Sequence, residues 1–418
     1  MKRKILLLLT VLLMFGTLNN VAFAEDSSPE DEESTDAEST EELPEENSVA
    51  NKVDKLSIEN AVKLATESDR KILELEDGIN KAKDARRQGK NAREQAETLM
   101  ALPLREVSAM GVDITDNYVD KLLAKNDYYT KYADAQISQL EKGKDQLAKG
   151  IEIETKALYY NVLVAEKTVE INQANLNKAN EQLRVENLKF DSGTATKAEV
   201  LNAQLAVQKS KTDLDSAKDD LNISRLDLFN RLNLPLDSET VLTDKELTYI
   251  PTVKIDLNEA IEKAKADRPE ILTAQNNLEL QKIETHVYQA YYTANLWQHK
   301  SAAQKLESAE LDVPQAYKDV ELDVRKAYMN LVKAERALVN MDKTVELSKE
   351  ASRVNQLLYE NGMVTSLDVL NADTDLANAE IGRYQLLAAY NISKLAFDGS
   401  NIIGTATVAP ADDIAEAE

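Results

Sequence analysis

The feature that most constrains this chain is a motif that occurs twice, with the second copy 169 positions after the first. Residues 190–203 read FDSGTATKAEVLNA, and residues 359–372 read YENGMVTSLDVLNA. The same offset pairs Tyr159 with Tyr328, and no gap is needed in between. A coiled coil requires such a constant register, because one added residue would turn every later side chain away from the seam. We therefore interpret the chain as an internal duplication of a coiled-coil unit.

Upstream of the long arms the two halves match at a different offset. Residues 56–62 read LSIENAV and residues 255–261 read IDLNEAI, which are 199 positions apart. The first half therefore holds 30 extra residues, the difference between 199 and 169. We expect this extra length between Leu73 and Lys156, at the irregular stretch from Pro103 to Asp116.

Proline, which interrupts helices, is absent from two long stretches: between Pro103 and Pro235, and between Pro314 and Pro410. From residue 151 to residue 235 the only glycine is Gly193. This pattern predicts very long helices that break at one point. In the first half we expect arms at 151–190 and 197–233, each roughly 55 to 60 Å long at about 1.5 Å per residue, and the first is longer if it continues back toward Asp116. In the second half residues 287–310 also have a helical pattern.

Apolar residues recur every seven positions on both arms of the first half: Val162, Val169, Leu176, Leu183 and Phe190, then Val200, Val207, Leu214, Leu221 and Leu228. Small residues occupy the companion positions of the returning arm: Ala203, Ser210, Ala217 and Ser224. Large and small residues in alternation favour close knobs-into-holes packing of two helices. The seam of the second half is more polar: Leu331, Leu338, Val345, Ser352 and Tyr359. We therefore expect each hairpin to need lateral packing against other hairpins.

The repeated motif has the chemistry of a turn between two helices. Gly193 and Gly362 can take the left-handed conformation that ends the ascending helix. The pairs Thr196 with Glu199 and Thr365 with Asp368 have the spacing of capping boxes for the descending helix. The sequence thus predicts two αα-hairpins, and we expect a short strand or an extended crossing in the connector between them.

Composition and punctuation divide the chain into six segments: a signal peptide (1–24), an acidic disordered linker (25–50), a first helical repeat (51–234), a connector (235–254), a second helical repeat (255–400) and a C-terminal tail (401–418). The signal peptide begins with basic residues, continues with an apolar run and ends at Ala22-Phe23-Ala24, a pattern that is typical of an exported protein. The linker has twelve acidic residues and no basic one. The whole chain has a net charge of −24, of which the linker contributes −12 and the signal peptide +3, so residues 51–418 carry −15. This negative charge disfavours nucleic acid or anionic lipid as the main partner.

The sequence contains no pattern that predicts catalysis or a cofactor. There is no cysteine, and therefore no disulfide or thiol chemistry. His286 and His299 are the only histidines, and their spacing fits no metal motif. Aromatic residues gather toward the hairpin ends opposite the glycine turns: Tyr128, Tyr129, Tyr132, Tyr288, Tyr291, Tyr292 and Trp297. They fit either contact with a membrane interface or wall polymer, or the simpler packing of helix ends.

A signal peptide, two tandem hairpins and the tip pattern F/Y-x-x-G-x-x-T-x-x-[DE]-V-L-N-A together resemble the TolC-type outer-membrane efflux family, over residues 56–400. The resemblance implies a homotrimer whose hairpins form a helical tube. It also implies a periplasmic adaptor protein and an inner-membrane pump as partners, a place in the cell envelope, and passage of small molecules or proteins outward. The adaptor would dock on the tip residues Gly193, Thr196, Val200, Leu201, Gly362, Thr365, Val369 and Leu370. Glu199, Asp368 and Asn371 would line the entrance.

The chain departs from the family's pattern at two places. Family members carry barrel strands between the arms of each half, but here about 50 residues separate Leu272 from Arg325, so we expect those strands to be absent or minimal. The family entrance combines two aspartates with an arginine, whereas this tip has Asp368, Asn371 and Val364. Asp368 can form an acidic ring or serve only as a helix cap. A non-transport coiled-coil scaffold or spacer of the envelope, derived from the same family, is the alternative function. Contact with a membrane stays open.

Overall fold

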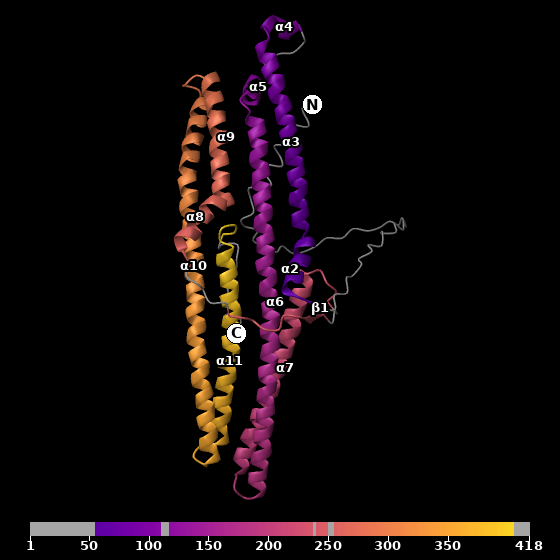
Figure 1. Cartoon of the computed structure of the whole chain (residues 1–418), viewed down its shortest axis with the longest axis vertical. Helices are drawn as coiled ribbons and strands as arrows, with labels where there is room; N and C mark the ends of the chain where they lie inside the picture. The colour runs from indigo at the N-terminus through magenta and orange to yellow at the C-terminus, as the bar shows by residue number, and fades with distance from the viewer. Residues whose placement is uncertain (1–54, 110–116, 237–239, 250–254, 405–418) are drawn as a thin grey trace, which may run out of the picture. The chain divides into compact units, whose positions relative to one another are not determined.

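The computed structural model describes residues 55–109, 117–236, 240–249 and 255–404. The chain divides into two units, and all the described residues belong to the second, Ala50–Glu418. The expected signal peptide, the acidic linker and most of the C-terminal tail lie outside the described residues. Within the described part, strand is limited to β1 (Lys55–Leu56) and β2 (Val241–Leu242), and all other regular structure is helical (Figure 1). The predicted all-α fold, with minimal strand, is confirmed.

The helices follow the two offsets of the sequence: α2 (Ile58–Glu67), α3 (Arg70–Ala101), α4 (Leu104–Ala109), α5 (Tyr118–Lys125), α6 (Tyr128–Asp191), α7 (Lys197–Arg231), α8 (Leu257–Asp267), α9 (Pro269–Tyr291), α10 (Trp297–Glu360) and α11 (Ser366–Asp398). Helices α6 and α10 are both 64 residues long, and their first residues are 169 positions apart. Helices α8 and α9 begin 199 positions after α2 and α3. The extra length of the first half lies in a longer α3, in α4 and α5, and in residues 110–116, which are not described.

Both ascending helices extend beyond the heptad arms. Helix α6 begins at Tyr128, which is the continuation toward Asp116 that the sequence leaves open, and its 64 residues span roughly 96 Å. Helix α10 begins at Trp297 and runs through Pro314. The helical pattern over 287–310 is wrong at one point, because residues 292–296 form a turn between α9 and α10. These extensions are held by packing of α6 on α3 and of α10 on α9.

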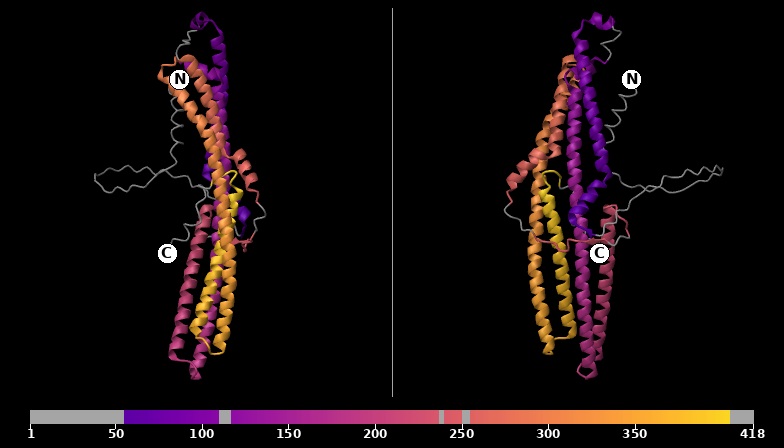
Figure 2. Two further views of the ribbon diagram at one scale, coloured as in Figure 1. Left: turned by 90° about the vertical axis from the view of Figure 1, so that its left-hand side faces the viewer. Right: turned by 45° about the vertical axis from the view of Figure 1, so that its right-hand side comes forward.

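Helix α6 lies at the centre of the arrangement. Toward the hairpin turns it contacts α7 and α11, and α11 in turn contacts α10, which gives the order α7–α6–α11–α10 (Figures 1 and 2). Toward the other end α6 contacts α3 and α9, and α9 contacts α10, so that α9 takes the place of α11. Helices α7 and α10 are therefore the two edges of the tip half.

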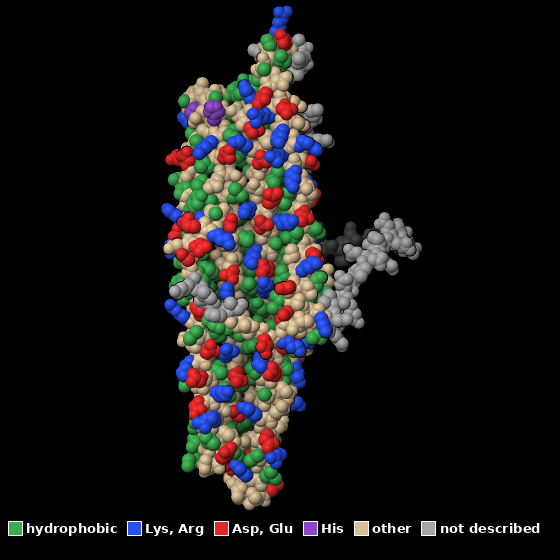
Figure 3. Space-filling model, in the orientation of Figure 1, with side chains coloured by type: hydrophobic (Ala, Val, Ile, Leu, Met, Phe, Trp, Pro, Cys, Tyr) green, Lys and Arg blue, Asp and Glu red, His purple; other side chains and the backbone are tan. Residues whose placement is uncertain are grey.

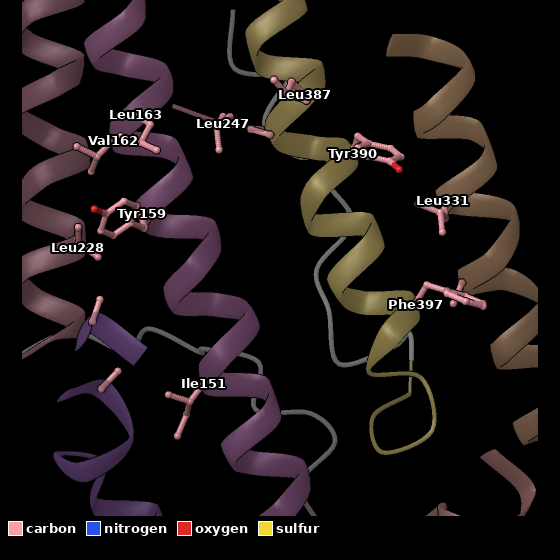
Figure 4. Close-up of a cluster of buried hydrophobic side chains, with 14 of the residues drawn as sticks. Ile151, Tyr159, Val162, Leu163, Leu228, Leu247, Leu331, Leu387, Tyr390 and Phe397 are labelled. Atoms are coloured by element: carbon pink, nitrogen blue, oxygen red, sulfur yellow. The ribbon is translucent and has the colours of Figure 1, made fainter. Parts of the chain in front are cut away.

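The largest buried cluster surrounds the middle of α6. Strand β1 pairs in parallel with β2, with Leu56 opposite Leu242. The hydroxyl of Tyr159, which is fully buried, donates to the carbonyl of Leu56 at 3.0 Å. From the second half, Tyr390 on α11 points toward Leu331 of α10 (Figure 4), and both residues belong to the same buried cluster. Both hairpins, both strands, α2 and α8 thus share one core, which joins the two halves of the sequence.

Along α6 and α10 the heptad seam is buried best near this core and less toward the tips. On α6, Val162 is fully buried and Phe190 is 41% exposed, with half-buried residues between them. On α10, Leu331 and Leu338 are buried, whereas Val345, Ser352 and Tyr359 are half-buried. The seam of α7 shows no such gradient: Val200, Ala203, Leu214, Ala217 and Leu228 are buried, and Val207 and Leu221 are half-buried. The predicted coiled-coil seam is confirmed, with a gradient on the two ascending helices.

Two ionic junctions lie at corresponding places in the halves. In the first, Arg231 at the end of α7 pairs with Asp69 at 3.3 Å and with Glu154 at 2.9 Å. In the second, the buried Arg268 pairs with Asp323 at 2.9 Å and donates to the carbonyl of Ser400 at 3.2 Å. By the sequence offsets, Arg268 stands where the first half has Asp69, and Ser400 stands where it has Arg231. The arginine of the junction thus comes from the end of α7 in the first half and from the residue before α9 in the second.

Candidate functional site

The two hairpin tips have the same backbone geometry. Gly193 and Gly362 have φ of +77° and +71°, a region that other residues rarely enter. The amides of Gly193 and Gly362 donate back to Phe190 and Tyr359, and the following amides donate to Lys189 and Leu358. This pair of hydrogen bonds is a Schellman motif, which satisfies the last carbonyls of α6 and α10. The left-handed glycines predicted from the sequence are confirmed.

Each descending helix starts with a complete capping box. The Glu199 amide donates to the Thr196 hydroxyl at 3.3 Å, and the Thr196 amide donates to the Glu199 carboxylate. Thr365 and Asp368 repeat this arrangement at the start of α11. The hydrogen bonds from Thr196 lower the pKa of the Glu199 carboxyl, and those from Thr365 lower the pKa of the Asp368 carboxyl. Both tips therefore carry a fixed negative charge at neutral pH.

The predicted tip residues divide into supporting and accessible ones. Val200 and Val369 are buried within the chain, where they hold the returning helices in place. Gly193, Thr196, Leu201, Gly362 and Thr365 are exposed, and Leu370 is half-buried. Sequence reasoning missed three further exposed apolar side chains at the tips: Leu188, Met363 and Leu367. Met363 is 72% exposed, and its position directly after Gly362 in a tight turn was the available signal.

A buried hydrogen bond joins the two hairpins near the tips. Glu186 on α6 is only 2% exposed, and its carboxylate accepts from the Tyr359 hydroxyl on α10 and from the Gln182 amide at 3.1 Å. The Lys189 ammonium lies 3.8 Å from the centre of the Tyr359 ring. Burial, and then the bond to Glu186, raises the pKa of Tyr359. Glu186 was not among the predicted residues, because acidic residues on long helices are usually solvated.

A second polar contact between the hairpins lies one step closer to the core. Asp373 on α11 accepts from the Ser352 hydroxyl on α10 at 2.6 Å. Its carboxylate also pairs with the Lys178 ammonium on α6 at 3.1 Å. Glu186 and Lys178 of α6 thus both bind the second hairpin, and these two contacts hold the tips in position relative to each other.

A groove of about 320 Å³ lies between the two hairpins on the tip side of the core. Its lining is rich in asparagine: Asn172, Asn175, Asn202, Asn371 and Asn378. The predicted entrance residue Asn371 thus lies in this groove, together with Leu370. Glu199 and Asp368, the other two predicted entrance residues, do not line it, and their carboxylates cap their own helices. The structure therefore separates the three residues into two places.

Most exposed apolar side chains of the two edge helices form one stripe on each helix, although Val339 and Leu357 of α10 are exposed outside it. On α7 they are Leu201, Leu205, Ile223 and Leu226; on α10 they are Leu311, Leu322, Met329, Leu347 and Val354. Successive members of each stripe are separated by close to a whole number of helical turns, so each set lies on one face of its helix. These side chains are between 39 and 68% exposed. We call these two sets the α7 stripe and the α10 stripe.

Charged side chains of both signs are interspersed over the face of the molecule shown in Figure 3. Among the described residues, no group of three or more histidine, cysteine, aspartate or glutamate side chains is placed to hold a metal ion. None of the helices in the described part of the chain combines the length and the hydrophobicity of a membrane-spanning segment.

No protein-family model matches the sequence, and no curated protein matches it either. Solved structures do match. The outer-membrane channel OprN is 15% identical with a TM-score of 0.61, over 84% of this chain and 90% of that one. The outer membrane protein VceC from Vibrio cholerae is 14% identical with a TM-score of 0.57, over 83% and 96%. The open state of the MtrE outer membrane channel from Neisseria gonorrhoeae is 15% identical with a TM-score of 0.54, over 82% and 88%. The chain therefore has the fold of the TolC-type outer-membrane efflux channels.

Proposed function

We propose that this protein is an exported, non-enzymatic component of an efflux or secretion assembly in the cell envelope. Copies of the chain associate, as a trimer by resemblance, into a helical tube. An adaptor protein tied to an inner-membrane pump docks on the hairpin tips, and small molecules or proteins pass outward through the tube. The observation that carries this proposal is the pair of exposed apolar stripes on the two edge helices of a TolC-like fold.

The stripes support self-association because they lie on opposite edges of one layer. The α7 stripe is on the edge helix that packs on α6, with Leu205 also lining the groove, and the α10 stripe is on the edge helix that packs on α11. If the α7 stripe of one copy packs on the α10 stripe of the next, the contact is heterologous, and repeated rotation closes a ring. Such a ring also covers the weakly buried tip half of the seam.

The tips are suited to docking because they are rigid and partly apolar. The Schellman turns and capping boxes fix the backbone, so that Leu201, Met363 and Leu367 present apolar surface without a large loss of entropy on binding. The charged carboxylates of Glu199 and Asp368 stand beside this surface. Repeated around a ring they would favour the passage of cations.

The first test measures self-association and transport with the same set of variants. Met329→Arg places a charge in the α10 stripe, and Val339→Arg, on the same helix but about a quarter turn away and 55% exposed, is the matched control. Light scattering behind size exclusion should give a discrete oligomer for the wild type and Val339→Arg and a monomer for Met329→Arg. In cells that lack the protein, the wild type and the control should restore export of a fluorescent dye, and Met329→Arg should not.

Two results together would contradict the proposal. The wild-type protein would be a well-folded monomer, and cells that lack it would show unchanged dye export and protein secretion. That outcome would favour the alternative of a coiled-coil scaffold, in which each hairpin satisfies its own seam.

A further inference from the structure

The turn between α9 and α10 exposes apolar side chains to solvent. Trp297 is 75% exposed, Tyr291 is 48% exposed and Leu296 is 41% exposed. Leu296 is the N-cap residue of α10 and gives no side-chain hydrogen bond to the helix. At the hairpin tips the same position holds Thr196 and Thr365, which cap their helices. Apolar residues thus stand where capping residues would stabilise the helix.

The neighbouring tyrosines have a structural explanation, and Trp297 does not. Tyr291 packs on Tyr118 of α5 and on Tyr292, at 5.5 and 4.8 Å between ring centres. Tyr128 and Tyr129 also pack on each other, and burial raises the pKa of both to about 12. Packing of helix ends, the simpler expectation, therefore accounts for these rings. These packed rings lie next to the exposed turn.

The charge of this turn differs from that of the rest of the chain. The stretch between Glu284 and Glu307 includes no acidic residue, although the whole chain carries a net charge of −24. It includes Lys300 and Lys305 and both histidines of the chain, His286 and His299 (purple in Figure 3). Glu284, the nearest acidic residue along α9, pairs with Lys305 at 3.5 Å. Asp127 at the start of α6 pairs with Arg93 at 3.3 Å, whereas Asp120 on α5 is exposed.

We propose that the α9–α10 turn, with Tyr291, Leu296 and Trp297 as its apolar contacts and Lys300 beside them, binds the surface of a lipid bilayer. Tryptophan and tyrosine favour the region between acyl chains and headgroups, where one side of the ring is apolar and the other is hydrated. Lys300 adds attraction to anionic headgroups. The contact is peripheral, with side chains entering the interface and the helices remaining outside it.

A lipid surface suits the turn better than a wall polysaccharide. Aromatic rings stack on sugars as well, but polysaccharide hydroxyl groups also need acceptors, and carboxylates are the strongest acceptors among side chains. The run between Glu284 and Glu307 has none, and the exposed carboxylate of Asp120 on α5 already accepts a hydrogen bond from the Tyr129 hydroxyl. The aliphatic Leu296 beside Trp297 adds apolar contact area that a sugar does not use. The proposal does not depend on self-association or transport.

The chain's single tryptophan allows a direct test, because Trp297 reports on this turn alone. The experiment uses the chain from Glu25 onward, which retains the whole compact unit Ala50–Glu418, because the apolar run at 5–18 would itself bind vesicles. The probes are phosphatidylcholine vesicles with and without a minority of phosphatidylglycerol, and vesicles with brominated acyl chains. We expect the tryptophan emission to shift to shorter wavelength with vesicles and to be quenched by the brominated lipid.

Variants show whether the named residues carry the binding. The double variant Tyr291→Ser with Leu296→Ser should weaken vesicle binding about tenfold, because less apolar area enters the interface. Lys300→Gln should weaken binding about fivefold, and only with the anionic vesicles. Met363→Ser is the matched control, since Met363 is 72% exposed at the opposite end of α10. It should bind as the wild type does.

Two results would overturn the proposal. One is an emission spectrum that vesicles of either composition leave unchanged. The other is a shift produced by purified wall polysaccharide and not by lipid, which would assign the turn to the polymer instead.

Discussion

At the scale of single residues, the hairpin tips depend on the backbone freedom of glycine rather than on space. A Cβ atom added at Gly193 or Gly362 would meet no atom within 4 Å. The only obstacle to a larger residue is therefore the positive φ of each position. Gly143, inside α6, also has nothing within 4 Å of an added Cβ, but its φ is not positive. The two kinds of glycine differ in conformation alone.

This difference predicts opposite effects of one substitution. Gly193→Ala should lower the free energy of unfolding by about 1 kcal/mol, because alanine is strained in the left-handed region. Gly143→Ala should raise it by about 0.5 to 1 kcal/mol, because alanine favours the helix interior. Urea unfolding followed by circular dichroism measures both. Equal effects of the two changes would mean that tip conformation does not limit stability.

These local features were accessible to sequence reasoning, and the contact between Glu186 and Tyr359 was not. A glycine followed by a threonine and an acidic residue predicts a turn, because all the partners lie within a few positions. Glu186 meets a partner 173 residues away, and its sequence neighbours look like any solvated helix. Only the placement of one hairpin beside the other shows that this carboxylate is buried.

At the scale of elements, the bond between Glu186 and Tyr359 links the ascending helices of the two hairpins, and we expect it to contribute to stability. Tyr359→Phe removes the donor from a buried carboxylate, which should lower the free energy of unfolding by about 1 to 3 kcal/mol. In a double-mutant cycle with Glu186→Gln, the coupling energy should exceed about 0.5 kcal/mol.

The matched control for this pair is Tyr317→Phe. The Tyr317 hydroxyl takes part in an exposed hydrogen bond, accepting from Gln275 at 3.0 Å. Its loss should cost less than about 0.5 kcal/mol. If Tyr359→Phe is as mild as the control, water replaces the bond and the hairpins are not linked there.

Helix boundaries show where sequence rules for elements fail. Pro314 lies inside α10, although proline removes a helical hydrogen bond. Both Pro314 and Glu310 are exposed, so the carbonyl that loses its partner can be hydrated, and packing of α10 on α9 outweighs the local cost. The offsets of 169 and 199 predicted which helices correspond, since they follow from the sequence alone. The starts of α6 and α10 depend on what each helix packs against.

At the scale of the whole unit, the core lies at the middle of α6 and the tips lie far from it. The free energy of local opening depends on how much apolar surface a segment buries. We therefore expect hydrogen exchange of the isolated chain to be slowest around 151–165 and 385–397, where the core cluster is densest. Residues 185–205 and 355–372 should exchange faster, although they are mostly helical.

Mass spectrometry of deuterated peptides measures this gradient along α6. Uniform protection from one end of that helix to the other would contradict it. Protection that rises near the tips with protein concentration would instead be the expected sign of copies packing along their stripes.

The two ionic junctions restrict which single substitutions the chain can accept. Arg231 pairs with Asp69 and Glu154 in the first half. In the second half Arg268 pairs with Asp323, and Arg268 occupies the position that corresponds to Asp69. Exchanging Arg268 for aspartate alone would bring acidic groups together without a cation, because Ser400 stands where the first half has arginine. Passing from one arrangement to the other needs coordinated changes at distant codons. Once both positions of a junction have changed, neither can change back alone without loss of the ion pair. Recombination between the two halves would then give chains in which the residues of a junction do not match.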